Sequence, residues 1–125
     1  MRQIYKAETD VCSEKIADQI ITALEGGSGY WLGSFKLYRS EIEPSEKPWY
    51  ADRKLYEGDF EIICQPSEPG DFEDKHFSPQ SIRDGLKVLA EKHHTVLADI
   101  LMEEGDADTA DVFLQCCLFG EVVYG

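Results

Sequence analysis

The chain has 125 residues, of which 42% are hydrophobic, and this predicts one globular domain with a single buried core. Its 25 Asp and Glu residues outnumber 12 Lys and Arg residues, which gives a formal net charge of −13. This charge disfavours direct binding to nucleic acid or to an anionic membrane, because both need clustered cations.

The N-terminal third is expected to contain a helix between two strands. Residues 2–7 indicate a short first strand. Apolar side chains then recur every fourth residue over 11–25, which predicts an amphipathic helix that ends at the pair Gly26-Gly27. The aromatic, partly alternating segment 30–42 predicts the second strand.

The middle of the chain predicts two further strands, over 53–56 and 59–65. Alternation in the second of these places three side chains on one face: Phe60, Ile62 and Cys64. Prolines, a glycine and many charges mark 66–77 as an irregular connection.

Helices are expected from residue 78 onward. Ser78-Pro79 is typical of a helix start, with a capping hydroxyl and a proline at the first helical position. Apolar positions at helical spacing extend to Met102, either as one helix or as two that separate at His93-His94.

A last helix is predicted after Asp106 or Asp108, either of which can cap it, and Gly120 is expected to end it. This helix is apolar on much of its circumference, so we expect it to be buried either centrally in the fold or in a homodimer. Residues 122–124 indicate a closing strand.

This order of elements predicts a single α+β domain over 1–125, in which helices pack on one face of a small antiparallel sheet. No apolar run approaches the about 20 residues of a transmembrane helix, and the first residues do not resemble a signal peptide. The four cysteines lie in apolar patterns without a C-x-x-C pair, which is typical of free thiols in a reducing cytoplasm.

Catalytic and metal-binding motifs are weak, and no cofactor, metal ligand or catalytic residue is predicted. The glycine-rich segment 25–29 follows a helix, whereas a phosphate-binding loop follows a strand. Asp106, Asp108 and Asp111 resemble part of a calcium loop, but Cys117 stands where the closing glutamate belongs. A small metal-dependent enzyme is therefore only an alternative hypothesis.

A second alternative is a protein that sequesters a nucleotide immune signal. Tyr30 and Trp31 would stack on the base. Arg39, Arg53 and Lys54 would hold the phosphates.

Charge distribution favours a different function. No Lys or Arg follows Lys92, whereas carboxylates are frequent there. Such a region is either an ordinary solvated surface or a face that docks on a basic partner, and we take the second as the leading hypothesis. The expected partner-binding residues combine these carboxylates with two aromatic side chains that we expect to be exposed: Glu103, Glu104, Asp106, Asp108, Asp111, Trp49 and Tyr50.

Two segments resemble a family of small phage and prophage proteins. Residues 23–31 are similar to its ALEGGSxYW motif, and residues 106–125 are similar to its closing segment, DADTADVFLQxxLFGEVVYG. The resemblance implies a phage origin and a role in the cytoplasm of an infected bacterium. By analogy with other small acidic phage proteins, it implies a non-enzymatic inhibitor of a host defence factor, such as a CRISPR effector.

Overall fold

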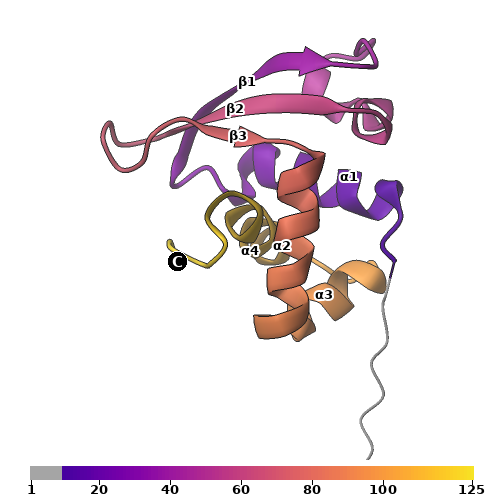
Figure 1. Cartoon of the computed structure of the whole chain (residues 1–125), viewed down its shortest axis with the longest axis vertical. Coiled ribbons are helices and arrows are strands. Elements are labelled where there is room, and N and C mark those ends of the chain that lie inside the picture. The colour runs from indigo at the N-terminus through magenta and orange to yellow at the C-terminus, as the bar shows by residue number, and fades with distance from the viewer. Residues whose placement is uncertain (1–9) are drawn as a thin grey trace, which may run out of the picture.

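A three-stranded antiparallel sheet forms one layer of the fold, and helices lie against one of its faces (Figure 1). The structure is a computed structural model that describes residues 10–125, so the strand predicted at 2–7 lies outside the described residues. The strands occur in the order β1 (Leu32–Ser40), β2 (Phe60–Pro66) and β3 (Lys75–Phe77). The predicted α+β architecture is confirmed.

Four α-helices supply the second layer: α1 (Ser13–Thr22), α2 (Pro79–Lys92), α3 (His94–Leu101) and α4 (Ala107–Phe119). A π-helical turn, Ala23–Gly27, extends α1. Two short 3-10 turns, Trp49–Ala51 and Arg53–Glu57, lie between β1 and β2.

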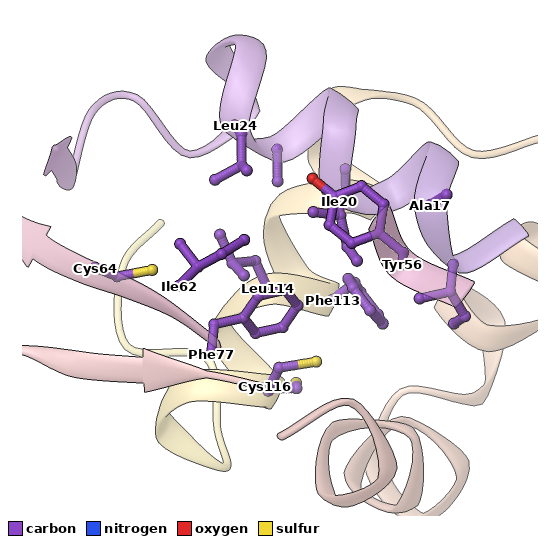
Figure 2. Packing of buried hydrophobic residues seen from close by; sticks show 14 of the residues in the cluster. Ala17, Ile20, Leu24, Tyr56, Ile62, Cys64, Phe77, Phe113, Leu114 and Cys116 are labelled. Atoms are coloured by element: carbon purple, nitrogen blue, oxygen red, sulfur yellow. The ribbon is translucent and has the colours of Figure 1, made fainter. Parts of the chain in front are cut away.

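The core forms where the sheet meets α4. Phe60, Ile62 and Cys64 are fully buried on one face of β2, as their alternation predicts. Figure 2 shows Ile62 pointing toward Leu114 of α4, and Phe113 and Leu114 are also fully buried. Central burial within one chain therefore accounts for the apolar circumference of α4, and a homodimer stays a prediction.

The helix ends follow local sequence signals. Ser78 caps α2 and Asp106 caps α4, each in a reciprocal hydrogen-bonded box with the residue three positions later. Gly120 ends α4 in the left-handed conformation, with a φ of 73°. The chain restarts its helix at His94, which decides between the two alternatives for 78–102 in favour of two helices.

The structure corrects two expectations and refines a third. Residues 53–56 form a 3-10 turn rather than a strand, because the Asp52 carboxylate accepts from the Lys54 amide. The segment 66–77, predicted to be irregular, contains β3, where fully buried Phe77 pairs with β2. Residues 122–124 form no strand, since their backbone groups bond to a side chain of α4 instead.

Candidate functional site

The two motif segments, 23–31 and 106–125, meet at the carboxylate of Asp111 on α4. Its Oδ1 accepts from Ser28 Oγ at 2.8 Å and from Trp31 Nε1 at 2.7 Å. Its Oδ2 accepts from the Tyr30 hydroxyl and from Gln115 Nε2, the latter at 3.1 Å. The side chain is thus buried among four neutral donors, which occupy the lone-pair directions of both oxygens.

This arrangement corrects the prediction that Asp111 belongs to a partner-binding face. Only 7% of the residue is exposed. The physical reason is the tight turn that begins at Ser28, whose carbonyl accepts from the amides of Trp31 and Leu32. That turn aims three donors from residues 28–31 at α4, and together they offset the cost of burying a carboxylate.

Tyr30 keeps its proton at this junction. Burial of its hydroxyl and the hydrogen bond to Asp111 raise the pKa of Tyr30 to about 12. The phenol therefore donates to the carboxylate at neutral pH, while 56% of the residue is exposed to solvent. It is both part of the buried network and part of the surface.

Gln115 extends the network to the C-terminal segment. Its Oε1 accepts from the amides of Val123 and Tyr124, each at 2.8 Å, and its Nε2 donates to the Tyr124 carbonyl at 3.0 Å. The Tyr124 ring stacks on Trp31 with centroids 5.5 Å apart. Sequence reasoning missed Gln115, although Asp111 and Gln115 are polar residues four apart in the apolar part of α4, a spacing that places them on one face of the helix.

A cavity of about 420 Å³ opens beside this junction. It combines two carboxylates, two phenol rings and two valines: Tyr30, Asp108, Asp111, Val112, Val122 and Tyr124. Aromatic faces next to carboxylates attract cations, and the apolar walls suit the methylene stem of a basic side chain.

An acidic segment, defined here as residues 103–108, leads into this cavity. Four of its six residues carry carboxylates, and all four are exposed: Glu103, Glu104, Asp106 and Asp108. Asp106 also caps α4, and the hydrogen bonds from Thr109 lower the pKa of the Asp106 carboxyl. Glu103, Glu104 and Asp108 therefore carry the charge that is free to meet a partner.

The two predicted aromatic contacts of a partner are not fully exposed. Trp49 and Tyr50 are half-buried, and their rings lie 6.0 and 5.3 Å from the ring of Phe35 on β1. The predicted exposure is therefore only partial, because both rings pack against Phe35 and against the edge of the core. Part of each ring still reaches the surface.

The five residues of the nucleotide hypothesis lie in different places. Trp31 is buried among three other aromatic rings. Arg39 Nη1 lies 2.6 Å from the Asp59 carboxylate, and Arg53 pairs with a carboxylate of α1.

The cavity that Arg39 lines has a volume of about 590 Å³ and is separate from the one that Tyr30 lines. Several carboxylates share it: Glu41, Glu57, Asp59 and Glu61. Lys54 lies on the exposed side of its 3-10 turn. The cations and the aromatic rings named for a nucleotide therefore do not converge on one pocket.

Within residues 10–125, no group of three or more His, Cys, Asp or Glu side chains is placed to hold a metal ion. None of the helices in the same range is both long and apolar enough to cross a membrane. Comparison of the chain with protein-family models, with curated proteins and with solved structures gives no match.

Proposed function

We propose that this protein is a non-enzymatic binding protein that docks on a basic surface of another protein through its acidic segment. The observation that carries the proposal is the row of exposed carboxylates at 103–108, in a part of the chain where no Lys or Arg follows Lys92. Unpaired carboxylates on one short segment create a local negative potential that speeds encounter with a basic partner.

The neighbouring cavity supplies the close contacts that charge alone does not give. Tyr30 offers a half-exposed aromatic face beside the exposed carboxylate of Asp108. A basic side chain of the partner would lay its stem along the valines and its charge over the ring. The Asp111 network holds Tyr30 in place, so its ring is ordered before the partner arrives.

The resemblance to phage proteins suggests what the partner is. A host defence protein that handles nucleic acid, such as a CRISPR effector, presents a groove lined by Lys and Arg. Carboxylates spaced along an exposed segment would occupy that groove in place of phosphates. The protein would then block the host factor in the cytoplasm of the infected bacterium without any chemical step.

The experiment is affinity capture of partners from a bacterial lysate at low and high salt, with three versions of the protein. The first is the wild type, and the second is the triple variant Glu103→Gln, Glu104→Gln, Asp108→Asn. The third is a control that also removes three exposed negative charges, from loops elsewhere: Glu43→Gln, Glu46→Gln and Glu68→Gln.

We expect a stoichiometric partner that the wild type and the control retain at low salt and that the triple variant loses. High salt should release it from the wild type and from the control, because screening weakens contacts between exposed charges. A partner that the triple variant retains as well as the control does would contradict the proposal.

A further inference from the structure

The cavity beside the Asp111 network has the size of a small-ligand pocket, since its volume of about 420 Å³ lies in the usual range of about 300–1,000 Å³. Four of its seven lining residues supply aromatic rings or methyl groups: Tyr30, Val112, Val122 and Tyr124. Within residues 10–125, five large hydrophobic residues stay exposed, and Tyr30 and Val122 are two of them. Apolar surface that stays open in a hollow favours a ligand that covers it.

The charge around this cavity is negative. Asp108 and Asp111 line it, and no Lys, Arg or His of residues 10–125 does so. None of the ion pairs in the same range involves either carboxylate. The four neutral donors of Asp111 solvate its charge without cancelling it. A cation in the cavity would therefore compensate charge that the described part of the chain leaves uncompensated.

The hydrogen-bonding groups of the cavity decide which kind of cation fits. Both oxygens of Asp111 are already engaged, and the Tyr30 hydroxyl donates to one of them while it accepts from Gln115 Nε2 at 3.4 Å. The Tyr124 carbonyl accepts from the same amide. Asp108 is the exposed carboxylate that remains. A primary ammonium carries three N–H donors and a guanidinium five, so either would have to keep its water or leave N–H groups unpaired.

We propose that this cavity binds a quaternary ammonium group, an inference that rests on the proposed function and names the cation that its cavity accepts. Such a group has no N–H donor, so it loses no hydrogen bond on entry. Its methyl groups would contact the rings of Tyr30 and Tyr124, whose faces attract a cation, and the two carboxylates would stabilise its charge. The group could belong to a free small molecule of the choline type or to a trimethylated lysine of the partner, whose stem would follow the valines.

The test is an NMR titration of the full chain at constant ionic strength, monitored at the backbone amides of residues 108–112 and 122–124. Three small probes are compared: choline, its neutral analogue in which carbon replaces the charged nitrogen, and ethanolamine. We expect saturable shifts with choline and binding about tenfold weaker with the other two, because one lacks the charge and the other keeps its N–H donors.

A second pair of probes distinguishes the two sources of the group: N-acetyl-trimethyl-lysine amide and unmodified N-acetyl-lysine amide. The trimethylated probe should bind more tightly than the unmodified one. Tighter binding of the trimethylated probe than of choline assigns the group to a side chain of the partner. Choline that binds at least as tightly assigns it to a free small molecule.

Two variants of Tyr30 separate the aromatic ring from the hydroxyl. Tyr30→Leu and Tyr30→Phe both lose the hydrogen bond to Asp111, but only the phenylalanine keeps an aromatic face. We expect choline to bind about fivefold more weakly to Tyr30→Leu and within about twofold of the wild-type affinity to Tyr30→Phe. Asp108→Asn should also weaken choline several-fold, whereas Glu91→Gln, at an exposed position on α2, should leave its affinity unchanged.

Equal affinity for choline and its neutral analogue would overturn the inference, because the cavity would then bind apolar surface alone. Equal affinity for choline and ethanolamine, or equal loss in the two Tyr30 variants, would overturn it as well. The two proposals fail separately. If the quaternary probes do not bind while the triple variant loses its captured partner, the cavity inference alone is wrong. If choline binds as expected while the triple variant keeps its partner, the docking proposal alone is wrong.

Discussion

Replacement of Asp111 by asparagine tests whether this carboxylate is a structural centre or an ordinary surface charge. In Asp111→Asn, the amide oxygen still accepts from Ser28 and Trp31, and the Tyr30 hydroxyl can rotate to accept from the new NH₂ group. The Gln115 side chain cannot adjust to the new NH₂ group in this way. Its amide cannot rotate by 180°, since its oxygen already accepts from two backbone amides of the C-terminal segment.

The expected loss of stability follows from this unfavourable contact between the new NH₂ group and the Gln115 side chain. The variant loses a hydrogen bond from Gln115 to a charged acceptor, worth about 1.5–3 kcal/mol, and leaves two NH₂ groups facing each other. Removal of a buried charge offsets part of this cost. We therefore expect the free energy of unfolding to fall by about 2 kcal/mol.

The assay is equilibrium unfolding in urea followed by far-ultraviolet circular dichroism, because Trp31 belongs to the site and its fluorescence would report local changes. With an m-value of about 2 kcal/mol/M, the midpoint should fall by about 1 M. Asp108→Asn is the matched control, on the same helix but exposed, and it should change stability by less than about 0.5 kcal/mol. Equal stability of the two variants would refute the structural role of Asp111.

Three further outcomes are expected. Gly85→Ala should destabilise the protein by about 2 kcal/mol despite alanine's better helix propensity, because its Cβ would lie 2.4 Å from Cys117 Sγ between α2 and α4; unchanged urea stability would contradict this. Burial raises the pKa of Cys64 to about 12 and of Cys116 to about 11, so both favour the folded state below the ordinary thiol pKa, and stability should fall as pH rises above about 9. Replacing both cysteines by alanine should flatten the alkaline slope, and an unchanged slope would argue against the thiols. At the acid end, the lowered pKa of Asp106 means that its contribution is present above about pH 4 and is lost below that, so Asp106→Ala should show a shallower loss of stability on acidification than the wild type.

Local signals in the sequence were sufficient for the helix ends. Ser78, Asp106 and Gly120 act through side chains and backbone within three or four residues, and the structure confirms each of them. The alternation in β2 likewise predicts its buried face. These elements need no information about the rest of the chain.

The elements that sequence reasoning missed depend on distant partners. The three residues of β3 are too few for an alternating pattern, and they form a strand because Phe77 completes the core against Ile62. Residues 122–124 resemble a strand in composition, yet Gln115 binds their backbone in place of a neighbouring strand.

Some features of the candidate site could likewise be predicted from the local sequence, and others depend on residues distant in the chain. Glu103 and Glu104 lie in the polar turn before α4 and Asp108 lies in the first turn of α4, and all three are exposed, as their polar sequence context suggests. The inward direction of Asp111 depends on donors about 80 residues earlier in the chain, so neither spacing nor composition reveals it.

The most direct test of the docking proposal is competition between this protein and nucleic acid for the partner captured from the lysate. A fluorescent oligonucleotide bound to that partner should be displaced at a stoichiometric amount of the wild type and of the control in which Glu43, Glu46 and Glu68 are neutralised. The triple variant of the acidic segment should displace it only at about tenfold or higher concentration. Simultaneous binding of protein and oligonucleotide, or equal displacement by the triple variant, would contradict the account.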